Sequence, residues 1–586
     1  MPRPLLARLL RLRLWLTERI TRGETLLIYL WAGLVGCLGG LAALLFRWVC
    51  DALQTQATGS SKPWIDAAAD QPSTWLVLVP AIGGLIAGLV LQFGSRFTRG
   101  RRAADYMEAV SLGDGVIRSR PTLVRVVSSV FSIASGGSIG REGPMVQLAA
   151  MIASRVGKLA RFPTPRLRLL VACGAAAGIA SAYNAPIGGA LFVAEIVLGS
   201  IAMESFGPLL FASFMATVVA RALLGGAPLF TIPAFKIVSL YELPAYLALG
   251  LLLGALAPAF LWLLEASGKA FARINAPLYL RMALGGACVG AISIHHPYVL
   301  GNGYGALSLI LSTDWIWSAL LVLVVFKLAA TCATVGSGAV GGVFTPTLLI
   351  GAAIGGLVGT SAHALAPSLT APAHAYSLVG MGAFLAATTH APFMANLMLF
   401  DMTLSHEIVL PLMLACVSAV ALAQALQRNS IYSRSLKPKE SEAAEVPLAL
   451  LRVRDLMRPD PPSVGLEARF TEIVGVFAKN RHQHLYVVGP AGEFRGAIPL
   501  HEIKPLLNDA DLANVVIAED IVKDDFLRVR PDSELSEALE KFMSHPGERL
   551  PVVGPSSDGA GVLLGSISKT DLMLTLAHGG RAKPDA

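Results

Sequence analysis

Residues 140–144 read Gly-Arg-Glu-Gly-Pro and lie within an apolar stretch rich in small residues. An ionisable pair is costly in such a setting, which marks the stretch as a candidate functional site. Pro144 favours the first turn of a helix, and the apolar residues 145–154 can continue that helix. Glu142 would then lie where unpaired backbone N–H groups collect, a place that suits an anion. The stretch therefore predicts an anion site around Glu142.

Part of this stretch occurs twice in the chain. Ser135-Gly136, Gly140 and Pro144 reappear with the same spacing as Ser337-Gly338, Gly342 and Pro346. Gly174, Ala185-Pro186 and Glu195 are likewise matched by Gly380, Ala391-Pro392 and Asp401. The second loop, residues 342–346, has Phe344 where the first has Glu142. We predict two related halves, at about 25–225 and 240–436. Such halves commonly have opposite orientation, with a substrate site between them.

The composition is that of a polytopic membrane protein. The 586 residues are 54% hydrophobic and 15% charged, with a mean hydropathy of +0.61, whereas soluble domains are about 25% charged. Predicted spans are Leu26–Val49, Trp75–Leu91, Leu243–Leu264 and Ile316–Thr331. Apolar runs around 134–154 and 333–359 are interrupted by glycine and proline, which indicates broken or re-entrant helices. The predicted fold class of this part is all-α, with the chain crossing the membrane several times.

The net charge of +8 is carried by clusters of basic residues beside the apolar spans. The clusters lie within 3–22, 96–102 and 155–168, and the positive-inside rule places all three in the cytoplasm. The arginines flank apolar spans and form no interleaved aromatic platform, so we expect no nucleic-acid partner. We interpret residues 1–24 as a cytoplasmic amphipathic helix, and we expect both termini on that side. The six cysteines have neither Cys-x-x-Cys nor histidine at ligand spacing, so no metal site or disulfide framework is expected.

The last part of the chain is soluble in composition. Residues 437–449 form a polar linker between it and the membrane part, which spans 25–436. Val464, Glu472, Phe477 and Val487-Val488 then recur as Val529, Glu537, Phe542 and Val552-Val553. Each copy predicts a short strand, a helix, a Val-Val strand, a turn and another strand. We expect two small α/β modules, at 450–515 and 516–580.

Four segments together carry a family resemblance. Residues 140–144, 342–346, 173–186 and Ser430-Ile431-Tyr432 resemble the CLC family of chloride channels and proton-coupled chloride antiporters. The tail resembles a tandem pair of CBS domains. The resemblance covers about 20–436 and 450–580. It implies a CLC-like fold of two inverted repeats, and a homodimer with one chloride path per subunit. We expect a multi-pass protein of a bacterial inner membrane, embedded in lipid, without enzymatic activity.

The resemblance also assigns residue roles. Glu142 matches the gating glutamate, whose carboxylate occupies the site of the transported anion, so opening should respond to pH and anion concentration. Tyr432 matches a hydroxyl donor at the inner anion site. The other expected anion-binding residues are Gly140, Arg141, Gly143, Val343, Phe344 and Thr345.

Two positions depart from the family pattern. Arg101 stands where the family usually has a serine that coordinates the inner anion. It would bind the anion, slow it, or face the cytoplasm. Ile196 stands where proton-coupled members often have a second glutamate, beside Glu195. Because isoleucine carries no proton, we predict gated, channel-like transport of chloride or a similar small anion. The alternative is a proton-coupled antiporter in which water or Glu195 serves as the proton path.

The tail contains one pattern for ligand binding. Ser568, Thr570 and Asp571 match the CBS residues that contact a nucleotide ribose and phosphate, and the first module lacks the equivalent hydroxyl and aspartate. Two alternatives follow: the modules bind an adenine nucleotide, or they form a purely structural pair. A membrane hydrolase is disfavoured, because the loop around Ser138 recurs with Val340 in its place.

Overall fold

The computed structural model describes residues 3–60, 62–69, 71–98, 105–230, 232, 238–433, 451–459, 461–479, 484–500, 502–503, 515–544, 547–555 and 561–577. The chain divides into two compact units, Met1–Lys437 and Pro438–Ala586. Arg101 and the predicted linker 437–449 lie outside the described residues.

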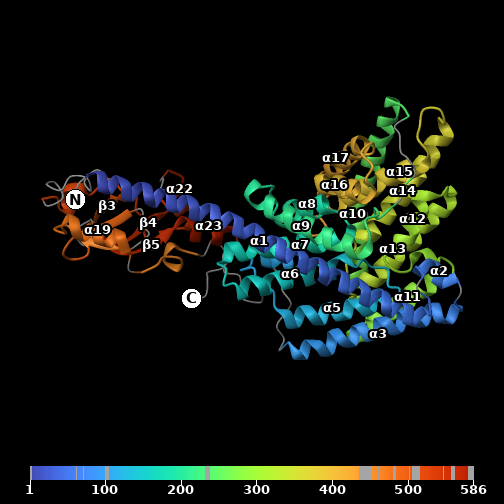
Figure 1. Cartoon of the computed structure of the whole chain (residues 1–586). Helices are drawn as coiled ribbons and strands as arrows, with labels where there is room; N and C mark the ends of the chain where they lie inside the picture. Colours follow the sequence, from blue (N-terminus) through green and yellow to red (C-terminus); the bar gives the residue numbers. More distant parts are fainter. Residues whose placement is uncertain are drawn as a thin grey trace. The chain divides into compact units, whose positions relative to one another are not determined.

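The first unit is helical in its described residues (Figure 1). Its first half contains α1 (Arg3–Thr58), α2 (Trp64–Ala69), α3 (Ser73–Phe97), α4 (Tyr106–Ser111), α5 (Ser119–Ala134), α6 (Glu142–Leu159), α7 (Thr164–Tyr183), α8 (Pro186–Phe192), the π-helix η1 (Val193–Val197) and α9 (Met203–Leu224). Its second half contains η2 (Leu240–Glu242), α10 (Leu243–Ala272), α11 (Leu278–Ser293), η3 (Pro297–Val299), α12 (Tyr304–Ser312), α13 (Trp317–Gly336), α14 (Phe344–Leu365), α15 (Ala373–Thr389), α16 (Pro392–Thr403) and α17 (Val409–Leu426).

Seven helices of the described chain are long and apolar enough to cross a membrane. Each of the four predicted spans coincides largely with one of them, and Met203–Leu224, Phe344–Leu365 and Val409–Leu426 are additional. Helix α1 continues without a break from Arg3 to Thr58, so residue 24 is not a helix boundary. The interruptions predicted around 134–154 and 333–359 lie at the turns before α6 and α14.

The two halves repeat the same helix packing. Helix α1 packs on α9 as α10 packs on α17, and α6 packs on α7 as α14 packs on α15. The pairs α3–α5 and α11–α13 correspond in the same way, and α8 meets α16 where the halves join. The repeat is therefore a structural one, as the sequence predicts.

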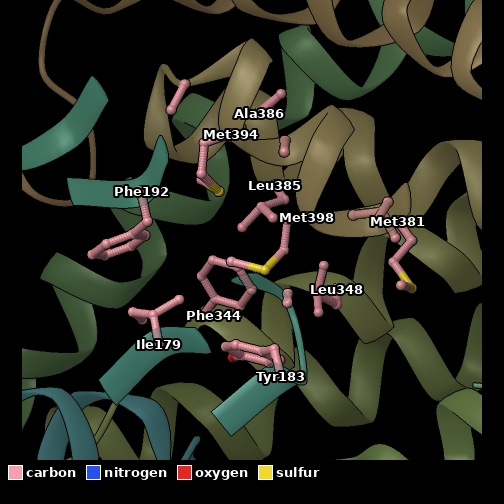
Figure 2. Close-up of a cluster of buried hydrophobic side chains, with 14 of the residues drawn as sticks. Ile179, Tyr183, Phe192, Phe344, Leu348, Met381, Leu385, Ala386, Met394 and Met398 are labelled. Carbon is pink, nitrogen blue, oxygen red and sulfur yellow. The ribbon is translucent and has the colours of Figure 1, made fainter. Parts of the chain in front are cut away.

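Small and aromatic residues fill the core between the halves. Helices α7 and α15 are rich in alanine and glycine and almost fully buried, which lets neighbouring helices approach closely. Phe344 lies among large side chains at the start of α14 (Figure 2). Its ring centroid is 4.8 Å from that of Tyr183 and 6.4 Å from that of Phe192. The first residue of α14 is thus held by side chains from the other half.

The second unit has the predicted α/β character in two similar modules. The first contains β1 (Ser463–Gly465), α19 (Phe470–Lys479), β2 (His484–Val488), β3 (Phe494–Pro499) and α21 (Ala518–Ile521), which packs in its core; the second contains η5 (Val453–Asp455), whose Val453 packs in its core, with α22 (Leu535–Ser544), β4 (Arg549–Gly554), β5 (Val562–Ser568) and α23 (Lys569–Ala577). Strand β1 pairs parallel with β2, which pairs antiparallel with β3, and β4 pairs antiparallel with β5. Val529 forms a single parallel bridge with Val552, matching the pairing of Val464 with Val487.

Candidate functional site

The two repeated loops meet and bond to each other. The N–H of Gly140 donates to the carbonyl of Gly342 at 2.6 Å, and the N–H of Gly342 donates to the carbonyl of Gly140 at 3.0 Å. These residues occupy equivalent positions in the two halves, so the exchange is reciprocal. The bridge fixes the starts of α6 and α14 beside each other, because each helix begins two residues after its glycine.

Glu142 points from the first half into the N-terminus of the second half's helix. Its Oε1 accepts hydrogen bonds from the N–H groups of Phe344 at 2.9 Å and Thr345 at 3.3 Å. Its Oε2 lies 3.4 Å from the donating Oγ1 of Thr345. The residue is 4% exposed. The carboxylate thus lies at the N-terminus of α14, a helix of the other half, with the positive end of the α14 dipole facing it. We call the Phe344 N–H, the Thr345 N–H and the Thr345 hydroxyl the cradle.

The glycines beside the cradle leave room for the carboxylate. A Cβ at Gly342 would overlap Oε1 of Glu142 and lie 2.7 Å from its Cδ. A Cβ at Gly140 would overlap both carboxylate oxygens. Only residues without a side chain allow this close approach, which explains why both loops carry glycine at this position.

Tyrosine and phenylalanine rings enclose the cradle. The hydroxyls of Tyr183 and Thr345 lie 3.2 Å apart in a hydrogen bond. Tyr304 packs edge-on against Tyr183, with ring centroids 6.4 Å apart. Tyr183 is fully buried, so water is kept from this side of the carboxylate.

A cavity of about 520 Å³ opens beside Glu142. Tyr432 lines it, with its ring 5.6 Å from that of Phe192. Gln147 also lines it and accepts a hydrogen bond from the N–H of Tyr106 at 3.0 Å. The cavity additionally contacts Gly143 and Val343 and the charged residues Asp105, Arg125 and Glu265. The structure therefore brings Glu142, Gly143, Val343 and Tyr432 to one space. Ile196 is buried and does not line that cavity.

Arg141 is directed away from its neighbour in the sequence. Its guanidinium forms an ion pair with Asp51 of α1 at 2.8 Å. A structural ion pair between Arg141 and Glu142, the plainest alternative to a functional glutamate, is therefore not formed.

Glu195 takes part in a second reciprocal exchange between the halves. Its Oε2 accepts from the N–H of Met394 at 2.7 Å and its Oε1 from that of Phe393 at 3.4 Å, both in the first turn of α16. Asp401 accepts from the N–H groups of Ile187 and Gly188 at 2.9 Å each, in the first turn of α8. Each acid caps the helix of the other half, which satisfies two otherwise unpaired donors. Glu195 thus has a structural role in this arrangement.

The three candidate nucleotide-binding residues of the tail contact other residues of the tail. Asp571 forms an ion pair with Arg458 at 2.8 Å. The hydroxyl of Thr570 donates to the carboxylate of Glu548. Ser568 Oγ accepts from the N–H of Asp571 at 3.3 Å. A nucleotide that used these three groups would have to replace these contacts.

Sequence reasoning missed several groups at the site. Gln147, Tyr106 and Asp105 line the cavity, and Tyr183 supports Thr345. Gln147 was detectable as a lone polar residue in the apolar run after Pro144. Tyr183 and Asp105 have no such signal, because only the tertiary packing brings them to Glu142.

Known proteins match both units of the chain. The family model described as "Voltage gated chloride channel" matches residues 83–424, and the CBS domain model matches 453–508 and 518–578. The "Putative chloride channel protein ClcB-like" of Ralstonia nicotianae is 49% identical over 422 residues, which cover 71% of this chain and 98% of the relative. The "Voltage-gated ClC-type chloride channel ClcB" of Citrobacter koseri is 38% identical over 407 residues, covering 68% and 97%.

Two solved structures also align with this chain. A slow cyanobacterial Cl⁻/H⁺ antiporter aligns with a TM-score of 0.63 and 26% identity, over 70% of this chain and 97% of its own. A eukaryotic CLC transporter aligns with a TM-score of 0.61 over 93% of this chain and 97% of its own. At 17% identity the second comparison shows the fold alone.

Proposed function

We propose that this chain, which belongs to the CLC family of voltage gated chloride channels, conducts chloride through a path gated by Glu142. The family consists of channels and transporters, so its members move chloride or a similar small anion across membranes and are not enzymes. What remains to be tested is which residues act, and whether transport is channel-like.

One observation carries the proposal. The Glu142 carboxylate accepts hydrogen bonds from the N–H groups of Phe344 and Thr345, at 2.9 and 3.3 Å. A permeating anion would accept the same bonds. The donors are backbone dipoles at a helix N-terminus, with no lysine or arginine in the cradle. Such donors hold an anion weakly enough for it to leave again, which conduction requires. The tethered carboxylate therefore competes with chloride for one site.

The gate opens when the Glu142 carboxylate leaves the cradle. A proton on Glu142 removes the negative charge, so the carboxyl no longer makes charge-assisted bonds to the cradle. A chloride ion that takes the Phe344 and Thr345 N–H groups displaces the carboxylate in the same way. Conduction should therefore increase at low pH and at high chloride. The neighbouring backbone of Gly140, Arg141, Gly143 and Val343, and the Tyr432 hydroxyl, line the rest of the proposed path.

Channel-like transport is the reading we favour over proton-coupled antiport. Ile196 cannot carry a proton, and both oxygens of Glu195 accept backbone N–H bonds from α16. Antiport is supported by the resemblance to the cyanobacterial Cl⁻/H⁺ antiporter at 26% identity. We therefore keep antiport as the second candidate.

The assembly and the location of the protein are proposed by analogy with the family. We propose a homodimer with one path per subunit, in the inner membrane of a bacterium, with both termini in the cytoplasm. The bacterial chloride channels among the relatives support the location. The CBS pair would serve as a structural module, because Asp571 and Thr570 are already engaged by Arg458 and Glu548.

The test is chloride efflux from proteoliposomes with simultaneous recording of pH, for the wild type and Glu142→Gln. We expect chloride flux without stoichiometric proton movement, and a faster, pH-independent flux in the variant. Uphill proton movement driven by a chloride gradient would establish antiport instead. If Glu142→Gln changed neither rate nor pH response, Glu142 would not be the gate.

A further inference from the structure

Lys327 is a fully buried basic residue of α13 that the gate mechanism does not use. Its side chain is 0% exposed. Its Nζ donates to the carbonyls of Val299 at 2.9 Å and Gly301 at 3.0 Å. Among the described residues, no carboxylate forms an ion pair with it. An unpaired charge in a membrane span is expensive, and such residues usually have a function.

The ammonium is connected to the loop that carries Glu142. Gly301, whose carbonyl binds Lys327, donates its N–H to the carbonyl of Gly136 at 2.9 Å. Farther along α13, the hydroxyl of Thr331 lies 3.1 Å from that of Ser138, and Thr334 accepts from the Ser138 N–H at 3.2 Å. Lys327, Thr331 and Thr334 share one face of the helix by their spacing. That face therefore supports the loop that precedes Glu142.

Hydrogen bonding alone does not require a charge at this position. Both partners of Lys327 are carbonyl acceptors, so a neutral amide donor would satisfy them. The two carbonyls offset part of the cost of burying an ammonium, because its N–H groups donate charge-assisted hydrogen bonds to both. A neutral donor would avoid the desolvation cost of the charge. The retained charge thus needs another explanation.

The ammonium lies close to the cradle. A Cβ at Gly303 would be 3.4 Å from Nζ, and the next residue, Tyr304, packs against Tyr183. Tyr183 in turn bonds Thr345 of the cradle. Arg141, the basic residue next to Glu142, is offset by Asp51 at 2.8 Å. Lys327 is therefore a basic group behind the aromatic wall of the anion site, without an ion-pair partner among the described residues.

We propose that Lys327 is an affinity-determining residue, whose charge strengthens anion binding in the cradle without touching the anion. The inference rests on the proposed anion site at Phe344 and Thr345. In protein of effective dielectric constant about 20, one charge at a distance on the order of 10 Å changes anion affinity about ten-fold. Lys327 acts through its field, so a neutral residue that keeps its hydrogen bonds should lose the effect.

The experiment measures chloride binding to the full-length protein in detergent by isothermal titration calorimetry. Chloride replaces isethionate at constant ionic strength, so that screening stays the same. We expect Lys327→Gln and Lys327→Met to weaken chloride binding equally, by about ten-fold. Lys327→Arg should keep most of the affinity. Wild-type chloride affinity in Lys327→Gln would overturn the inference. This holds also if Lys327→Met is impaired, because a loss in that variant alone would show that the hydrogen bonds matter and not the charge.

A second variant keeps the inference testable if the neutral lysine variants do not fold. Asn302 lies between Gly301 and Gly303, and its Oδ1 accepts from the Tyr304 N–H at 3.2 Å. Asn302→Asp has the same shape and keeps that acceptor, but adds a negative charge near Lys327. We expect weaker chloride binding, and unchanged binding would refute a role for the charge. If the wild type itself bound no chloride, the proposed anion site would fail instead.

Discussion

Gly342→Ala should open the gate without altering the chemistry of Glu142. The new Cβ would overlap Oε1 of Glu142 and lie 2.7 Å from its Cδ and 2.8 Å from its Cγ. The atoms in the way belong to a flexible side chain, so the carboxylate can leave while the backbone stays. Gly342 has no positive φ, so alanine fits the backbone. The substitution therefore acts on the closed state alone.

The size of the effect follows from the bonds that are lost. Glu142 would give up its bonds to the N–H groups of Phe344 at 2.9 Å and Thr345 at 3.3 Å. Hydrogen bonds to charged groups contribute about 1.5 kcal/mol or more each, so the closed state would lose about 3 kcal/mol. Every 1.4 kcal/mol is roughly ten-fold, which gives a shift toward the open state of more than about a hundred-fold.

The assay is chloride efflux from proteoliposomes between about pH 3.5 and pH 8, a range that spans the protonation of an ordinary carboxyl group. The wild type should speed up as the pH falls, and Gly342→Ala should be fast throughout. Gly341→Ala is the matched control, because its Cβ would meet the Ile139 side chain and the Gly140 carbonyl and not the Glu142 carboxylate. The double variant Gly342→Ala/Glu142→Gln should behave like Glu142→Gln alone, since both act on one interaction. A wild-type acid response in Gly342→Ala, or additive effects in the double variant, would refute the reasoning.

Two further substitutions test the other assigned residues. Glu195→Gln should lower the stability of the detergent-solubilised protein by up to about 1 kcal/mol, because it weakens the cap of α16. The chloride flux of this variant should keep the wild-type acid response. A lost response would place Glu195 in a proton path. Glu548→Gln should tighten any binding of ATP by up to about five-fold, because it removes an exposed negative charge from Thr570. Thermal shift with ATP measures this, and equal shifts in wild type and variant would argue against nucleotide contact at Thr570.

Much of the architecture is predictable because it depends on local patterns. Long apolar runs must span a membrane as helices, and interrupted runs must break there. The breaks before Glu142 and Phe344, the repeat and the tandem α/β modules all follow from the order of the residues. The length of α1 did not follow, because the arginine-rich start and the first span form one continuous helix.

The sequence by itself determined that two equivalent loops exist, that one carries Glu142, and that the other carries Phe344. Only the tertiary structure decided that the loops bond through Gly140 and Gly342, and that the Glu142 carboxylate reaches into α14. The same holds for Glu195 and Asp401, which cap each other's halves, and for Lys327. These contacts join residues far apart in the chain, so they depend on the packing of the halves, which local patterns do not encode.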